Sequence, residues 1–586
     1  MCEPRLNNLK RRTAGFLAAA VLMQSGLAAA ARPEIVVTGV DGALLENVLA
    51  HMQIDDESCD TPSWRVRRLF REVEQEAREA LQAFGYYSAR VDKEFVTGEA
   101  CWSVRLMIEP GDPVVIRDVD VRVVGAGAEL KEFRDLVDDV PFQSDQVLNH
   151  GKYEAFKRRF TAVADRYGYF DGRFVSSRID VYPADYAADI VITYDTEVRY
   201  VFGEVTIDQD VVDPRLARGY MDFEPGEPYD SKLITRLYED ILGTGYFLGV
   251  DIRTTPRGEP HFDVPVSMKM NAAKHKTYSG GVGFGTDVGV KLRAGFLHRR
   301  LNAKGHQFEI NAKWSNVIAE AGMAYRLPLN DPRNNWLSID TGYKREDNAS
   351  AFSETWKVGA KLFRRQTINW LRTYLIDYGY EDWLVGVDKG TSRLLVPGVS
   401  WEHTMESGPP RPLDGVGARL SVSAASDKLV SDTSFMQVRA FGKFVHKLWP
   451  GARGLGRAEL GVTIKDEFDD LPASVRFFAG GDVSVRGYEF KSLGPTDELG
   501  LVVGGTHLAV FSYEVDQQFR ENWAVAAFID AGNAFNSFSD MDLEAGVGIG
   551  IRWFSLLGPI RFDLAFPLAD DASDDWRVHI TLGPDL

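Results

Sequence analysis

The segment EAGVGIGIRWF, Glu544–Phe554, alternates between two kinds of residue. One set of alternate positions is apolar: Ala545, Val547, Ile549, Ile551 and Trp553. The other set is small or polar: Gly546, Gly548, Gly550 and Arg552. A period of two residues predicts a β-strand with two different faces. PIRFDLAFP (Pro559–Pro567) and WRVHITLG (Trp576–Gly583) repeat the pattern, so the chain is expected to end in a run of strands.

Such a run fits two architectures. A soluble sandwich packs the apolar faces inward, whereas a membrane barrel turns them outward to lipid. About 16 strand candidates lie in roughly 310 residues, and an even number is usual in bacterial outer-membrane barrels. These features favour a transmembrane β-barrel over residues 274–586. Tryptophans near the ends of the candidates, where a membrane interface favours them, are Trp336, Trp356, Trp370, Trp383, Trp401, Trp523 and Trp576.

The first residues predict a signal peptide over 1–31. Basic Lys10–Arg12 precede the apolar stretch AGFLAAAVLMQSGLA, and Ala28–Ala31 offer small residues for cleavage. A membrane anchor is the alternative, although the apolar stretch is short for one. Later apolar runs do not approach the length of about 18 residues that a transmembrane helix needs. The chain is therefore expected to be exported.

A weak repeat organises the first half of the chain. EALQAFGYYSARV, AVADRYGYFDGRF and YEDILGTGYFLGV each end a helical pattern at Gly-Tyr-aromatic and continue as a strand. The glycines at these turns, Gly85, Gly168 and Gly245, suit the left-handed position after a helix. We expect three α+β domains, and one irregular α+β domain is the alternative. Their expected ranges are 32–112, 113–198 and 199–273.

Composition narrows the chemistry. The net charge of −18 argues against a nucleic-acid surface. Cleavage of the signal would leave Cys59 and Cys101, which we expect to form a disulfide in an exported protein, with two unpaired thiols as the alternative. The sequence has no CxxC or HExxH motif and no recognisable catalytic arrangement. We therefore expect no metal site, no cofactor and no enzymatic activity.

FFAGGDVSVRGYEF, Phe477–Phe490, lies between strand candidates and carries VRGY. With the α+β repeats before a barrel, it resembles the outer-membrane protein-assembly superfamily, whose repeats are called POTRA domains. The resemblance implies a 16-stranded barrel, in which this stretch is the sixth extracellular loop. GGTHLAVFSYEV, AFIDAGNAF and GPIRFDLAFPL are similar to the family's next strand motifs and follow in the same order. Three repeats and the final LGPDL point within the superfamily to the TamA family.

The resemblance implies that the loop, here 470–499, folds back into the barrel. Its motif residues are Val485, Arg486, Gly487 and Tyr488. In the family the arginine pairs with acids of the barrel wall, which correspond here to Glu514 and Asp530. The alternation of NWAVAAFIDAG places Asp530 toward the lumen. Glu514 is less clear, because Leu508 and Val510 share its face. An exposed arginine with unrelated acids is the alternative.

The two strands that close the barrel are expected to pair weakly. The first strand region is rich in glycine, which packs poorly in strands: Gly280, Gly281, Gly283, Gly285 and Gly289. The last strand ends at Gly583 before a proline, which lacks a donor. We expect a lateral seam that opens to template an incoming strand. Glycines that serve only close packing in the lumen are the alternative.

The expected function is non-enzymatic assembly or translocation of outer-membrane β-proteins such as autotransporters, from a site in the bacterial outer membrane with the POTRA domains in the periplasm. The resemblance implies as partners a TamB-like protein anchored in the inner membrane, client β-proteins and outer-membrane lipid. The alternative is a secretion channel of the two-partner type with one dedicated substrate.

Overall fold

The computed structural model describes residues 32–98, 101–367, 369–406, 411–465, 468–555, 558–569 and 576–582. The expected signal peptide, 1–31, and Gly583 lie outside these ranges. Within them, helices fall short of the length and apolarity needed to cross a membrane. The chain divides into two compact units, Met1–Tyr200 and Val201–Leu586.

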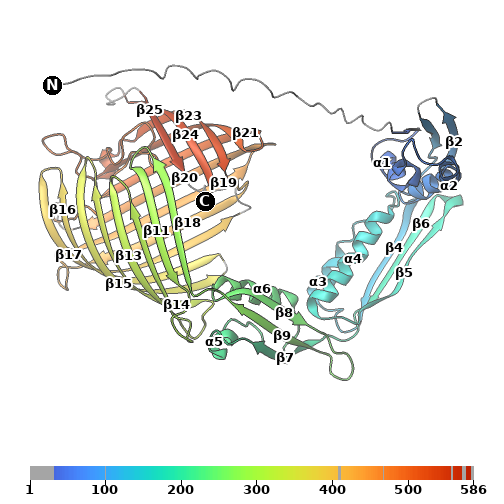
Figure 1. The fold of residues 1–586 in the computed structure, drawn as a ribbon, viewed down its shortest axis with the longest axis horizontal. Coiled ribbons are helices and arrows are strands. Elements are labelled where there is room, and N and C mark those ends of the chain that lie inside the picture. The colour runs from blue at the N-terminus through green and yellow to red at the C-terminus, as the bar shows by residue number, and fades with distance from the viewer. Residues whose placement is uncertain are drawn as a thin grey trace, which may run out of the picture. The chain divides into compact units, whose positions relative to one another are not determined.

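The first unit contains two α+β domains (Figure 1). Each has a three-stranded sheet in which the last strand lies in the middle, parallel to the first. The first domain, with strand order β1-β3-β2, comprises β1 (Glu34–Thr38), α1 (Gly42–His51), a 3-10 turn (Gln53–Asp56), α2 (Ser63–Gln82), β2 (Arg90–Thr97) and β3 (Trp102–Glu109). The second, with order β4-β6-β5, comprises β4 (Val115–Val124), α3 (Lys131–Asp138), α4 (His150–Tyr167), β5 (Arg173–Tyr182), a 3-10 turn (Pro183–Asp185) and β6 (Ala187–Asp195).

The second unit begins with a third domain of the same plan. Its strand order is β7-β9-β8, again with the last strand in the middle. Its elements are β7 (Val201–Asp208), α5 (Pro214–Arg218), α6 (Ser231–Gly243), β8 (Phe247–Thr254) and β9 (Asp263–Ala272). Each of the three expected domain ranges therefore contains one complete sheet.

The repeated Gly-Tyr turns have a common conformation. Gly85, Gly168 and Gly245 have φ of 89°, 81° and 71°, which L-residues rarely adopt. Gly168 is the left-handed C-cap of α4, and its N–H donates to the carbonyl of Ala164. Each glycine follows a helix and precedes a strand, β2, β5 or β8, so the repeat is a helix-to-strand turn.

The rest of the second unit is a closed barrel of 16 antiparallel strands (Figure 1). The expected fold class is thereby confirmed. The strands are β10 (Lys276–Gly285), β11 (Gly289–His298), β12 (Gln307–Trp314), β13 (Ile318–Pro328), β14 (Asn335–Asp347), β15 (Ala351–Thr367), β16 (Trp370–Val385), β17 (Asp388–Glu406), β18 (Gly415–Ala425), β19 (Phe435–Lys447), β20 (Ala452–Lys465), β21 (His507–Arg520), β22 (Trp523–Phe535), β23 (Glu544–Ser555), β24 (Gly558–Pro567) and β25 (Arg577–Leu582); a 3-10 turn, Phe538–Asp540, precedes β23.

The alternation in the sequence matches the two faces of the barrel wall. Ile549 and Ile551 are 63% and 45% exposed on the outer face of the wall, whereas Arg552, on the lumen face, is buried. The expectation was wrong for Trp383, which is buried and whose indole N–H donates to the Ser392 hydroxyl at 3.1 Å. It packs with Val385 and Ala473 of the loop after β20 instead of facing lipid. Its position near a strand end did not show whether the side chain faces lipid or the lumen.

The third domain is bonded to one end of the barrel. Tyr246 donates its hydroxyl hydrogen bond to the Gly305 carbonyl of the β11–β12 connection. Arg333 of the β13–β14 connection forms an ion pair with Asp222 at 3.0 Å. Gln307 donates to the carbonyl of Thr244 at 3.0 Å. This end, where β10 begins, is called the domain end below.

The first domain contains the expected disulfide geometry. The sulfur atoms of Cys59 and Cys101 are 2.00 Å apart, and the residues are separated by 42 positions. The bridge connects the segment before α2 to the start of the last strand.

We predict that replacing both cysteines by serine destabilises this domain by about 3–4 kcal/mol, because the unfolded chain regains the freedom of a loop of that length. Denaturant unfolding of the isolated pair of N-terminal domains measures this loss. Unfolding of the wild-type domains under reducing conditions gives a second measurement of the same loss. Equal stability of variant and wild type would contradict the prediction.

Candidate functional site: the in-folded loop and the barrel seam

The connection between β20 and β21 is described over 468–506, which includes the expected loop 470–499, and it folds into the lumen. Phe477, Ala479 and Val485 of this loop pack against Leu508 and Val510 of β21. The two β21 residues are 6% and 2% exposed. These apolar side chains lie on the lumen face because the loop covers them. They are the residues that made the face of Glu514 unclear from the sequence.

The seam between β10 and β25 has a short backbone ladder. Among the described residues it consists of one pair, Gly285 with Thr581, whereas β24 and β25 share six pairs. Gly280, Gly281 and Gly283 lie in β10, where the first two are exposed and Gly283 is half-buried. At the next seam position the N–H of Ile580 donates to the Thr286 side-chain hydroxyl at 3.1 Å rather than to a backbone carbonyl.

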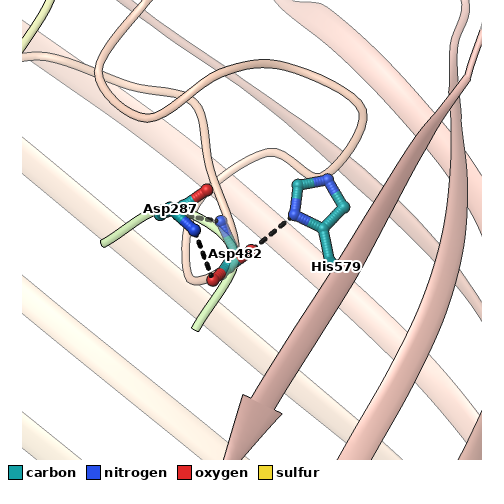
Figure 2. Close-up of side chains that lie close together, drawn as sticks. All are labelled: Asp287, Asp482 and His579. Carbon is teal, nitrogen blue, oxygen red and sulfur yellow. Dashed lines mark hydrogen bonds and ion pairs between the residues drawn. The ribbon is translucent and has the colours of Figure 1, made fainter. Parts of the chain in front are cut away.

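Side chains of the loop join the two seam strands. We call Thr286, Asp287, Asp482 and His579 the seam cluster. Asp482 Oδ1 accepts from the Thr286 hydroxyl at 2.7 Å. The same oxygen lies 2.6 Å from His579 Nδ1 (Figure 2). The N–H of Asp482 donates to Asp287 Oδ2 at 2.6 Å. One loop carboxylate therefore contacts both the turn after β10 and the last strand.

The hydrogen bonds fix the proton on His579. Its Nε2 accepts from the backbone N–H of Gly487 at 2.9 Å, and an N–H can only donate. The proton of the neutral ring therefore sits on Nδ1 and is donated to Asp482. Asp287, Asp482 and His579 are spaced closely enough to hold a metal ion. In this tautomer, however, neither ring nitrogen of the 1% exposed histidine has a free lone pair for a metal.

The two carboxylates of the seam cluster titrate differently. Burial, followed by repulsion from Asp482, raises the pKa of Asp287 to about 6. Burial also acts to raise the pKa of Asp482, but hydrogen bonds from His579 and Thr286 outweigh it and lower that pKa. Asp482 is therefore the charged member and Asp287 the one that takes up a proton in mild acid.

Because its folded pKa lies above the ordinary 3.8, Asp287 stabilises the fold most below that value, and the contribution is lost as the pH rises through about 6. We predict that Asp287→Asn, which keeps the acceptor oxygen, is more stable than wild type at pH 7.5. The difference should shrink as the pH falls to about 4.5. Urea unfolding of the barrel in detergent measures it. Asp470→Asn, in an exposed part of the same loop, is the matched control; a difference independent of pH would refute the assignment.

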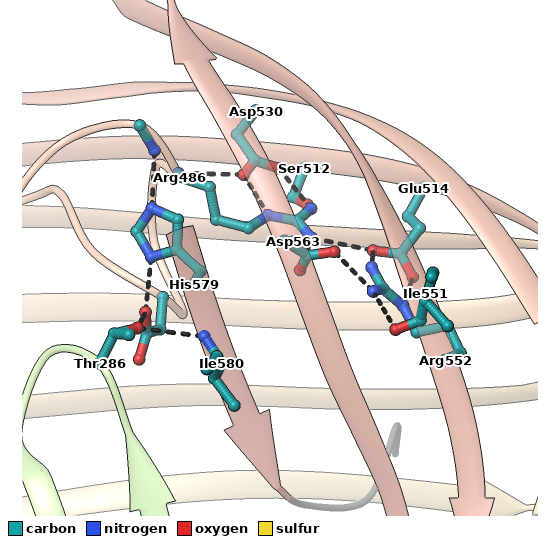
Figure 3. Close-up of polar contacts among 12 residues, drawn as sticks. Thr286, Arg486, Ser512, Glu514, Asp530, Ile551, Arg552, Asp563, His579 and Ile580 are labelled. Atoms are coloured by element: carbon teal, nitrogen blue, oxygen red, sulfur yellow. Dashed lines mark hydrogen bonds and ion pairs between the residues drawn. The ribbon is translucent and has the colours of Figure 1, made fainter. Parts of the chain in front are cut away.

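Arg486 occupies the centre of a buried ion network. Its Nε and its backbone N–H donate to Asp530 Oδ2 at 2.7 and 3.1 Å, and its Nη2 donates to Asp530 Oδ1 at 3.0 Å (Figure 3). Its Nη1 donates to Glu514 at 2.9 Å. The guanidinium carbon lies 3.4 Å from the centre of the Phe528 ring. The structure thus brings together the three residues that the resemblance paired.

Two members of the network were missed from the sequence. Asp563 of β24 accepts from Arg486 Nη1 at 3.0 Å. Arg552 of β23 donates to Glu514 at 2.8 and 2.7 Å and also contacts Asp563. Both occupy the polar positions of alternating segments. That position predicts a side chain on the lumen face, and it was the one feature of the sequence that could have identified them. We call these five residues the Arg486 cluster; all are at most 7% exposed.

Glycines allow the loop to approach the wall. A Cβ on Gly546 would lie 2.0 Å from the carbonyl oxygen of Arg486. Gly487 has φ of 102°, and a Cβ there would lie 3.1 Å from the backbone nitrogen of Pro567. Tyr488 anchors the other side by donating to Glu544 at 2.9 Å. Val485 is fully buried. Each residue of the VRGY motif therefore has a packing or hydrogen-bonding role in the lumen.

We predict that Arg486→Ala destabilises the barrel by about 3–5 kcal/mol, because it leaves buried carboxylates without their cation. The loop should then leave the wall and become sensitive to protease. Unfolding in detergent and limited proteolysis measure the two effects.

Arg345→Ala is the control, since Arg345 and its partner Asp347 are half exposed and such pairs contribute about 0–1 kcal/mol. An Arg486→Ala protein with the loop as resistant as in wild type would argue against the anchoring role.

Comparison with known families agrees with this geometry. Residues 279–584, more than half of the chain, match the family described as "Omp85 superfamily domain". Residues 34–110 match "POTRA domain TamA domain 1".

Similar proteins are assembly factors by name. The chain is 24% identical over 375 residues to the "Outer membrane protein assembly factor BamA" of Nitratidesulfovibrio vulgaris, which covers 60% of this chain and 46% of the relative. It is 22% identical over 431 residues to the protein of the same name from Neisseria meningitidis serogroup B, covering 61% and 53%. The chain thus spans about half the length of these curated relatives.

Among solved structures, BamA of Haemophilus ducreyi lacking POTRA domains 1–3 has a TM-score of 0.61 at 17% identity. The match covers 79% of this chain and 99% of that one. This likeness concerns the fold.

Proposed function

The chain belongs to the Omp85 superfamily, and on that premise we propose that it is a TamA-type factor that inserts or translocates outer-membrane β-proteins such as autotransporters. As in this family, the barrel lies in a bacterial outer membrane and the POTRA domains lie in the periplasm. The domain end of the barrel therefore faces the periplasm. The TamA-type match of the first domain and the presence of three sheets support this branch of the family.

The observation that carries the proposal is the seam. An open strand edge in lipid is costly, because its N–H and C=O groups have no partner there. Here the described part of the seam has one backbone pair and relies on side chains of the seam cluster. Release of Asp482 would expose the edge of β10 with few backbone bonds to break. An incoming client strand would then pair with that edge by β-augmentation.

The energy for insertion would come from the client itself. Each strand that pairs at the seam satisfies its backbone groups, and its outer side chains leave water for lipid. The proposal includes no enzymatic step and no cofactor. The POTRA domains would receive clients and a TamB-like periplasmic partner. Their outer strands, such as β2 and β5, have one edge without a strand partner among the described residues, which suits strand addition.

We predict that a disulfide between Gly285→Cys and Thr581→Cys, the paired seam residues, abolishes client insertion. Insertion of an autotransporter barrel into liposomes that contain the purified protein measures this. Reduction of the engineered bond should restore the rate. Asp482→Ala, which removes the loop carboxylate from the seam, should instead increase amide hydrogen exchange in β10 and β25 relative to β22.

The control is a disulfide at a paired position far from the seam, Ala418→Cys with Gly442→Cys on β18 and β19, which should leave insertion unchanged. Full insertion activity with the seam closed by the disulfide would contradict lateral opening. If the bonded protein still passed a soluble substrate through its lumen, the secretion-channel alternative would be favoured.

A further inference from the structure

Two arginines on the outer wall of the barrel stand directly opposite each other. Arg364 of β15 and Arg372 of β16 are partners in the strand register. Arg364 belongs to the same alternate set as Trp356 and Val358, which are 56% and 51% exposed. Lys357, of the other set, lines the cavity in the lumen. The arginine pair therefore projects away from the lumen.

The pair lies near the periplasmic end of the barrel. β15 ends at Thr367 and β16 begins at Trp370, so both arginines are close to this hairpin turn. The N–H of Arg365 donates at 2.7 Å to the carbonyl of Asn334, in the connection that also contacts the third domain. On a barrel in the outer membrane this is the level of the periplasmic leaflet.

The two charges lack the partners that other outward arginines have. Like charges opposite each other destabilise a sheet. Within the described ranges, neither Arg364 nor Arg372 forms an ion pair with an acid. Elsewhere on the outer wall, arginines pair with acids at 3.2 and 3.3 Å: Arg345 with Asp347 and Arg393 with Asp432.

One donor of the pair is covered but unused. Arg372 Nε is shielded from solvent and has no hydrogen-bond acceptor among the described residues. Its Nη1 donates to the Tyr374 hydroxyl at 3.3 Å. Aromatic rings hold the groups in place, since Arg364 lies 5.9 Å from the Tyr374 ring centre and Arg372 lies 5.9 Å from that of Trp401. Two cations held opposite each other, without an acidic partner among the described residues, call for an external anion.

We propose that Arg364 and Arg372 bind the phosphate of a glycerophospholipid headgroup in the periplasmic leaflet. The planar guanidinium donors match the spacing of phosphate oxygens, and one phosphate between the arginines removes their repulsion. Tyr374 and Trp401 suit the headgroup level, where aromatic side chains concentrate. The site depends on the membrane location of the barrel and is separate from the seam, which lies on other strands.

The test measures lipid retained by the purified, folded barrel. Native mass spectrometry is done after exchange into detergent with added phosphatidylglycerol, with diacylglycerol, which lacks the phosphate, or with inorganic phosphate alone. Wild type should retain phosphatidylglycerol only. A basic residue near a membrane surface contributes about fivefold in affinity, so Arg364→Gln or Arg372→Gln should weaken retention about fivefold and the double variant about twenty-five-fold.

Arg345→Gln is the matched control, because Arg345 is also outward but already paired with Asp347. Heat-modifiable migration on gels verifies that each variant is folded. Equal retention of phosphatidylglycerol by the double variant and wild type would overturn the proposal. Equal binding of inorganic phosphate would reassign the pair to a free anion, and retention of diacylglycerol would show that the chains rather than the phosphate are recognised.

Discussion

The burial of charge around Arg486 is the constraint on which the barrel interior depends. Glu514, Asp530 and Asp563 project from three strands into a region that excludes water. Buried carboxylates are costly unless cations and hydrogen bonds meet them. Arg552 supplies a cation from the wall, and Arg486 supplies another from the loop. The carboxylates of the wall therefore need the loop arginine to balance their charge. The arginine in turn needs these carboxylates as fixed hydrogen-bond acceptors.

The same stretch of loop extends this dependence to the seam. Asp482 and Arg486 are four positions apart, and a tight turn at Gly481 places one on the seam cluster and the other in the Arg486 cluster. Gly487, the residue after Arg486, donates to His579 of the last strand. A displacement of the loop would thus disturb both clusters, which couples the centre of the lumen to the edge of the barrel.

The sequence predicted the fold well because alternation reports directly on a wall with lipid on one side and a polar lumen on the other. It also located Arg486 and two of its acids, through a resemblance that covers the motif. It did not reveal Asp563, Arg552, Asp482 or His579 as partners, because strand register and loop path determine which polar residues meet. Trp383 was assigned to the wrong face for the same reason: a residue near a strand end can be covered by a loop from elsewhere in the chain.

The bond between Thr286 and Ile580 joins residues 294 positions apart. Contacts of such long range form late in folding, since a large loop must close before they yield any stabilisation. We therefore expect the neighbouring strands of this barrel to pair before β10 meets β25, so that the sheet is open at the seam until the last step. The intermediate through which the protein folds has the same unpaired edge that the mature protein would offer to a client, so its folding pathway and its working cycle pass through closely related states.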